Sequence, residues 1–422
     1  MSEMGWIDFS SEHREKVQTV IDLLKSEGVV DELGVGVIRD SFSDNLFPGI
    51  STIQTRAKYF TLTALLLREY DGLKDRIRRT KTVEDFLTER EKECRIQLVR
   101  RYGTSKQLGI VGVRSGESTA QDVQRHPSSI YWSGMQTFGL LRTSLSIAEY
   151  SHRHSGTPRN LSAVLQETDD ERGDDVYASD EQKSLVRVPE VDEDYWDNLS
   201  ITLTKEEAAF LNEHITVYVP DSLLGQILLH PSWSRSFIRH GQDDLTAIED
   251  LCELPFVEHL PAALRKILLT ARDFWLLLYG AHVRYNCLLQ NSFGSNGYYD
   301  EDWDEWLQNI KGFDWDSWET PYLWDVVKGR GRFVKGATRF FVERWIEETR
   351  RGHPSCQRTD QLITQQEKAN KGSRARLRAN ADERVNKWIG ISTLTYRIPQ
   401  AREIIGDIVR SMSGKADPNA GR

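Results

Sequence analysis

Two helical patterns meet at a Pro-Gly pair, and this break limits what the chain can fold into more than any other feature. Residues 33–70 read LGVGVIRDSFSDNLFPGISTIQTRAKYFTLTALLLREY. Apolar residues recur at helical spacing up to the Pro-Gly pair at 48–49, which ends the first helix. Ser51 followed by Gln54 is the capping-box pattern of a helix start, so a second helix is predicted over about 52–70. The stretch therefore predicts two helices joined by a tight hairpin.

The start of the second helix is a candidate phosphate-binding position. Its unpaired backbone N–H groups and the positive end of its dipole favour an anion. A helix-hairpin-helix element holds a DNA backbone in this way without reading sequence. A plain αα-hairpin with solvated polar residues fits the pattern equally well. The residues that could bind the backbone are Arg39, Gly49, Ser51, Thr52, Thr55, Arg56 and Lys58.

Two aspartates of the first helix are candidate catalytic residues. Asp40 and Asp44 are four residues apart and so lie on one helix face, where like charges repel unless a cation is near. A carboxylate beside a phosphate-binding hairpin could stabilise a sugar cation or activate water. The alternative is a solvated acidic face, which is common for exposed acids at this spacing.

A second unusual segment, residues 125–142, reads RHPSSIYWSGMQTFGLLR and predicts a helix that begins at its proline. Tyr131 and Trp132 would ordinarily pack in a core. They are also residue types that stack a base or fill the space that a flipped base leaves, and an amide such as Gln136 or Gln54 can pair with a cytosine edge. The functional interpretation depends on whether this helix faces the hairpin.

The net charge of −9 conceals an uneven distribution of charge. Residues 167–197 hold thirteen Asp and Glu against three Lys and Arg, so the rest of the chain is nearly neutral. Residues 328–415 hold twenty Lys and Arg against nine Asp and Glu, and 74–114 is a second Arg-rich stretch. Basic surfaces are often only solvated, but two of them around one hairpin favour a polyanionic partner such as DNA.

The chain has no apolar run of about 18 residues and no basic-then-apolar leader, which predicts a cytoplasmic protein with no membrane partner. The four cysteines are far apart and form no CxxC pair. No histidine pair lies near them to suggest zinc. The cysteine spacing therefore predicts no zinc site.

The periodicities together predict a mainly α fold, α-rich α+β, with a helix-hairpin-helix-like element near the N-terminus. An amphipathic helix is expected over 10–27 and a capped helix after Thr204, with short strands or extended segments at 107–113 and 198–204. The predicted parts are an N-terminal helical domain with the hairpin and the site (1–160), an acidic linker or loop (161–197), a helical middle domain (198–327) with a Trp-rich insertion (291–324) that suits packing or carbohydrate contact, and a basic helical C-terminal region (328–422).

Four motifs resemble a bacterial family catalogued as a domain of unknown function and found near phage-defence genes. They are GWIDF at 5–9, the hairpin motif at 34–60, PSSIYWSGMQTFGLLR at 127–142 and WIGISTLTYR at 388–397. One branch of that family is a DNA glycosylase that removes glucosylated 5-hydroxymethylcytosine from T-even phage DNA. The resemblance implies abasic sites in viral DNA and blocked phage replication. Residues 395–398 depart from the pattern, since a more acidic and aromatic version is expected there.

The resemblance assigns a role to each group of candidate residues. A glycosylase must seat the DNA backbone, flip a nucleotide, hold its base and place an anion near the sugar. Ser51, Thr52 and the basic helix would seat the phosphate. Asp44 or Asp40 would stand by the sugar, and Asp44 is favoured because it is nearer the hairpin. These roles call for no metal and no organic cofactor. Two alternatives stay open: a nuclease that binds Mg²⁺ through an acidic cluster, and a non-catalytic DNA-binding or sensor subunit of a defence system. The residues that would stack, fill or hold the base are Tyr131, Trp132, Gln54 and Gln136.

Overall fold

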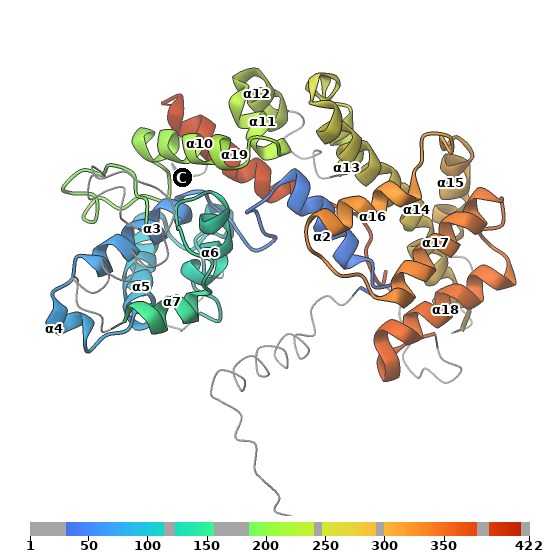
Figure 1. The fold of residues 1–422 in the computed structure, drawn as a ribbon, viewed down its shortest axis with the longest axis horizontal. Helices are drawn as coiled ribbons and strands as arrows, with labels where there is room; N and C mark the ends of the chain where they lie inside the picture. The colour runs from blue at the N-terminus through green and yellow to red at the C-terminus, as the bar shows by residue number, and fades with distance from the viewer. Residues whose placement is uncertain are drawn as a thin grey trace, which may run out of the picture. The chain divides into compact units, whose positions relative to one another are not determined.

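The computed structural model describes residues 31–113, 123–155, 185–239, 247–292, 299–377 and 388–414. Within these ranges the chain is built from helices, and the one β feature is an isolated antiparallel bridge between Leu141 and Val186 (Figure 1). The prediction of a mainly α fold is confirmed. The helix predicted over 10–27 and residues 161–184 of the acidic linker lie outside the described residues.

The two segments predicted as short strands or extended segments form no strand in the described chain, so the irregular alternative holds for both. Residues 107–113 form a 3-10 turn, η1 (Lys106–Leu108), followed by turns at glycines, and 198–204 lead irregularly into α10 (Lys205–Tyr218). The helix start predicted at Thr204 is confirmed, because its hydroxyl accepts a hydrogen bond from Glu207 N in a complete capping box.

The chain divides into two compact units. Unit 1 consists of Met1–Arg39 and Asp273–Thr393, and unit 2 of Asp40–Arg272 and Leu394–Arg422. Of the three boundaries, one falls inside α2 (Gly36–Leu46), one inside α14 (Ala262–Ser292), and the third lies between Thr393 and Leu394. Each unit therefore combines segments that are far apart in the sequence.

Most helices of unit 2 are short. Its helices are α3 (Lys58–Asp71), α4 (Asp75–Arg78), α5 (Val83–Tyr102), α6 (Pro127–Thr137), α7 (Ile147–His154), α10, α11 (Leu223–Leu229), α12 (Pro231–Arg239), α13 (Ile248–Cys252), the 3-10 helix η2 (Pro255–His259) and α19 (Ile398–Met412).

Helix α3 forms the core of unit 2, since most of its side chains are buried and it packs against α5 and α6 (Figure 1). It begins at Lys58, so the predicted start near residue 52 is wrong. Half of the expected capping box is formed, because Ser51 N donates to Gln54 Oε1 at 3.0 Å. The chain nevertheless stays irregular up to Ala57, and this segment is the hairpin loop described below.

Unit 1 buries most of its tryptophans, while Trp315 and Trp388 are half-buried. Trp303 stacks on Trp306, whose Nε1 donates to the Leu276 carbonyl of α14, and Trp345 Nε1 donates to Leu277 O. Trp303 and Trp306, which belong to the Trp-rich segment, are therefore packed side chains. The helices of unit 1, besides its parts of α2 and α14, are α15 (Asp300–Lys311), α16 (Thr320–Gly329), α17 (Gly336–Arg350), α18 (Gln357–Lys371) and the 3-10 helix η3 (Gly372–Arg374).

Candidate functional site

The hairpin loop, residues 47–57, has one backbone conformation that requires glycine. Gly49 has φ +77°, and a Cβ there would lie 2.8 Å from the Phe138 ring. Gln54 is buried and bonds within the loop, since its Oε1 accepts from Ser51 N and its Nε2 donates to Gly49 O at 3.1 Å. Gln54, predicted to hold a base, therefore holds the loop in this structure.

Tyr131 supports the loop from α6. Its fully buried hydroxyl accepts hydrogen bonds from Thr55 N at 2.8 Å and from Arg56 N at 3.1 Å. Burial raises the pKa of Tyr131 to about 12, so the phenol stays neutral. Thr55 is fixed further because its hydroxyl donates to Gly109 O at 2.6 Å. Tyr131 thus lies beneath the hairpin, whereas stacking on a base requires an exposed ring.

The start of α3, predicted as a phosphate seat, already holds an anion of the protein itself. Asp407 of α19 accepts from Ala57 N at 3.0 Å and forms two bonds of 2.9 Å with the Arg56 guanidinium. Arg56 and Asp407 are both buried. The positive end of the helix dipole and the cation therefore face a carboxylate, and this helix start is not open to DNA.

Lys58 is also buried and paired. Its Nζ donates to Glu207 Oε2 of α10 at 2.6 Å, and Glu207 also accepts from the hydroxyls of Thr61 and Tyr195. Burial lowers the pKa of Lys58, and Glu207 opposes that shift. Lys58 ties α3 to α10, whereas the predicted phosphate contact requires a surface position.

Helix α6 does face the hairpin, as the functional interpretation requires. A Cβ at Gly134 would lie 2.5 Å from Gly49 O, so α6 and the loop are in close contact. The polar ends of its two other candidates bond elsewhere: Trp132 Nε1 donates to Leu145 O at 2.9 Å, and Gln136 Nε2 donates to Leu145 O and to Thr143 O. These side chains fix the segment after α6.

Arg397 joins α2 to the hairpin loop, and no sequence pattern assigned it a role. Its Nη1 donates to Asp44 Oδ1 at 2.7 Å and to Ile50 O at 2.8 Å. The Asp44 side chain remains 25% exposed and that of Arg397 14%. The contact therefore gives an ordered carboxylate that a ligand can reach. The departure at 395–398 from the expected family pattern is the one sequence signal that pointed to this turn.

The backbone that carries Arg397 is strained. Tyr396 and Arg397 have φ of 45° and 67°, and they are the described non-glycine residues with positive φ. Each such conformation costs on the order of 1–2 kcal/mol. Tyr396 is held in place because its hydroxyl donates to Ala271 O at 2.8 Å and its ring packs edge-on against Phe42. Retained strain of this kind is typical of positions whose geometry matters for function.

The tip of the hairpin is exposed. Thr52 lies on the surface, and Ile53 is 41% exposed, so the tip presents an apolar side chain to solvent. Ser51 Oγ is buried without a hydrogen-bond partner among the described residues. Gln400, on the first turn of α19, has its amide nitrogen 3.4 Å from Thr52 O. Ile53 and Gln400 were not selected from the sequence.

The remaining candidates, Arg39 and Asp40, lie on α2 and are half-buried. Asp40 is one turn before Asp44. Asp44 is held against the hairpin loop, because Arg397 donates hydrogen bonds both to Asp44 and to Ile50 O.

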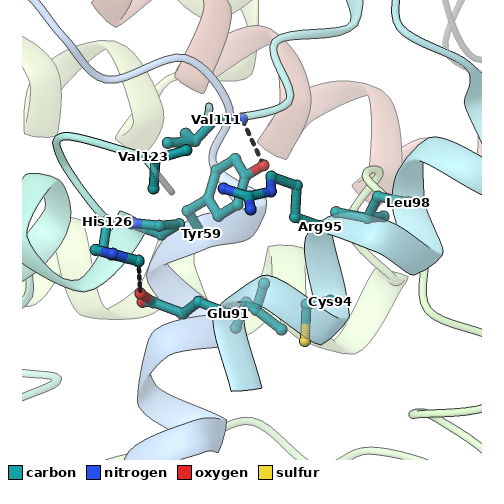
Figure 2. A pocket seen from close by; sticks show the side chains of 10 residues that line it. Tyr59, Glu91, Cys94, Arg95, Leu98, Val111, Val123 and His126 are labelled. Atoms are coloured by element: carbon teal, nitrogen blue, oxygen red, sulfur yellow. Dashed lines mark hydrogen bonds and ion pairs between the residues drawn. The ribbon is translucent and has the colours of Figure 1, made fainter. Parts of the chain in front are cut away.

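An enclosed pocket beside the hairpin support is too small for a base (Figure 2). Its volume is about 10 Å³, enough for roughly one water molecule. Glu91 of α5 lines it and accepts from Ser128 N at 2.6 Å. Its carboxylate also lies 3.4 Å from His126 Nδ1, and this is the contact drawn in Figure 2. Burial raises the pKa of Glu91. The carboxylate caps α6, and none of the predicted site residues lines this pocket.

Neither a metal cluster nor a membrane span occurs in the part of the chain that the structure describes. No group of three or more His, Cys, Asp or Glu residues there could hold a metal ion. No helix there is long and apolar enough to cross a membrane.

The fold and site define a mainly α protein in which a strained arginine turn fixes a carboxylate against an exposed hairpin. The chain belongs to the Family of unknown function (DUF6361), whose family model matches residues 1–411. A search of curated proteins and a search of solved structures each found no match to it.

Proposed function

We propose that the chain is an anti-phage DNA glycosylase that excises glucosylated hydroxymethylcytosine from phage DNA and leaves abasic sites. The observation that carries the proposal is the Asp44 carboxylate, ordered by Arg397 and partly exposed next to the hairpin loop. The resemblance of the hairpin motif at 34–60 supplies the substrate class. A glycosylase needs one positioned anion and a way to open the duplex, and both have candidates here.

In the proposed reaction, water adds to C1′ of the sugar as the bond from C1′ to the base nitrogen breaks. The base leaves with the bonding electrons and takes a proton from solvent, while the attacking water gives a proton to Asp44. The same carboxylate offsets the positive charge that develops on the sugar. Arg397 acts as a positioning residue, because its bonds to Asp44 and to Ile50 O fix the carboxylate relative to the loop.

DNA would be engaged by the hairpin tip. The exposed Thr52 would contact the backbone, and the exposed Ile53 would enter the base stack as an apolar wedge. This assigns to Ile53 the space-filling role first given to the buried Tyr131 and Trp132. Gln400, beside Thr52, offers an amide near the tip that could pair with a base edge.

A second candidate function is DNA binding without catalysis, as in a sensor subunit. The Asp44–Arg397 ion pair favours it, because a paired carboxylate can be purely structural. The two functions differ in the products that they leave on DNA.

The proposal is tested by incubating the full chain with glucosylated T-even phage DNA in EDTA, followed by alkali. Strand breaks that appear only after alkali are expected, since abasic sites are alkali-labile. The matched control is the same DNA without the modified base, which should stay intact. A parallel reaction contains magnesium in place of EDTA. Strand breaks that appear there without alkali, and are absent in EDTA, would indicate a nuclease. A shift of the DNA on a gel without any strand break would indicate the sensor.

A further inference from the structure

A groove of about 350 Å³ lies on unit 2 and plays no part in the proposed excision site. One wall is the exposed face of α10, and the other carries arginines from three separate segments. Arg68 comes from α3, and Arg142 and Arg187 flank the bridge between Leu141 and Val186. This volume lies within the range of small-ligand sites, about 300–1,000 Å³.

The groove is cationic. Arg68, Arg142 and Arg187 line it against a single acid, Glu213. None of the three guanidinium groups forms an ion pair with another described residue. Arg68 is oriented by its Nη2, which donates to Val186 O at 2.7 Å. Three converging guanidinium groups favour an anion with several oxygens, such as a phosphate.

An aromatic row forms the α10 wall. Phe210, His214 and Tyr218 follow one another at four-residue spacing, with ring centroids 4.3 Å apart for the first pair and 5.7 Å for the second. The His214 and Tyr218 rings are parallel to within 1°. Tyr218 is 43% exposed, so the row ends in an aromatic ring that is partly open to solvent.

This row is held rigidly. A Cβ at Gly139 would lie 2.1 Å from the Tyr218 ring, so the ring rests directly on glycine backbone. His214 Nδ1 is 3.0 Å from Phe138 O, and because a carbonyl only accepts, this nitrogen carries the hydrogen. Burial lowers the pKa of His214, which keeps the ring neutral. A fixed stacking face loses little conformational entropy when a ligand binds.

We propose that this groove binds a nucleoside phosphate, with the phosphate on the arginines and the base stacked on Tyr218. A cationic groove beside aromatic faces is the combination that holds single-stranded nucleic acid. A simple anion would use the arginines and leave the aromatic row without a function. The nucleoside phosphate can belong to a single strand or be a free nucleotide. The site does not depend on any role of Asp44.

The test measures binding of the full chain to two probes: fluorescein-labelled oligothymidylate by anisotropy, and unlabelled dTMP by calorimetry. Two groove variants are used, Arg142→Glu combined with Arg187→Glu, and Tyr218→Ala. Each should weaken binding roughly tenfold or more, since stacking of one base is worth about 1–3 kcal/mol. Arg265→Glu, an exposed position of α14, is the matched control and should leave affinity unchanged. Circular dichroism confirms folding of each variant.

The two probes distinguish the sources. Tight binding of the oligonucleotide with weak binding of dTMP supports a strand as the ligand, and comparable binding of both supports a free nucleotide. The proposal is overturned if the groove variants bind like the control or if neither probe binds. It is also overturned if inorganic phosphate competes as well as dTMP, because the aromatic row would then contribute nothing.

Discussion

At Asp44, one substitution separates a chemical role from a structural one. Asp44→Asn keeps the shape of the side chain and removes its charge, so DNA binding should survive while base release falls by about 10²–10⁴-fold. Single-turnover release from glucosylated DNA measures the effect. Asp40→Asn is the matched control, because it lies one turn away and should reduce release far less. Full activity of folded Asp44→Asn would place the catalytic carboxylate elsewhere.

Arg397 should matter more for activity than for stability. Arg397→Gly relieves the strain at φ 67°, roughly 1–2 kcal/mol, and loses a hydrogen bond of about 1 kcal/mol and an ion pair of about 0–1 kcal/mol. The free energy of unfolding should therefore change by no more than about 1 kcal/mol, while base release falls. Urea unfolding and single-turnover release measure the two quantities. A stability loss above about 3 kcal/mol, or unchanged release, would show that the turn is not a positioning device.

The hairpin is the element on which DNA engagement depends, and its tip is the position to test. Ile53→Ala should leave stability almost unchanged, because the side chain is exposed, yet it should reduce base flipping. Fluorescence of 2-aminopurine placed next to the modified base reports flipping. The matched control is Ile77→Ala on α4, which removes an equally exposed isoleucine away from the hairpin and should flip the base normally. Equal fluorescence for Ile53→Ala and wild type would show that Ile53 does not act as a wedge.

Tyr131 of α6 supports the hairpin loop through the hydrogen bonds that its hydroxyl accepts. Tyr131→Phe deletes the hydroxyl and leaves the backbone N–H groups of Thr55 and Arg56 buried without their acceptor. The expected cost is about 1–3 kcal/mol. Urea unfolding measures it, with Tyr218→Phe, at an exposed ring, as the control. No loss of stability would mean that the loop does not need this anchor.

The helix starts show how far local patterns reach. The start at Thr204 was predicted correctly, because both members of its capping box, Thr204 and Glu207, belong to one local turn. Ser51 and Gln54 present a similar pattern, but here the groups that decide where the helix begins are on Tyr131 and Asp407, which approach from distant parts of the chain. Local spacing contains no information about such partners. The same limit hid Arg397, which meets Asp44 only after folding.

Across the whole molecule, the composition of a segment does not show which of its cations are exposed and which are buried. The hairpin cations Arg56 and Lys58 looked like DNA contacts, but buried carboxylates from α19 and α10 pair with them. The compact units also draw on both ends of the chain, which segments of uniform composition do not reveal. The predominance of helix was predictable because periodicity is a local property.

The Lys58–Glu207 pair should make stability depend on pH once it is broken. Glu207→Gln leaves a buried, uncompensated ammonium and should cost about 3–5 kcal/mol at pH 7. The pKa of Lys58 is lowered in the folded state, so the unfolded state binds more protons and stability rises with pH up to the ordinary value of 10.5. Urea unfolding across this range measures the recovery. Lys58→Met combined with Glu207→Gln should show no such rise.

Release of a modified base by this chain is measured by mass spectrometry of the small products from T-even phage DNA. Wild-type protein in EDTA should release glucosylated hydroxymethylcytosine as a free base, and Asp44→Asn should release on the order of 10²–10⁴-fold less in the same time. If no free base appears while the DNA is bound, the chain is not a glycosylase for this base, and if wild type and Asp44→Asn release equal amounts, Asp44 is not its catalytic carboxylate.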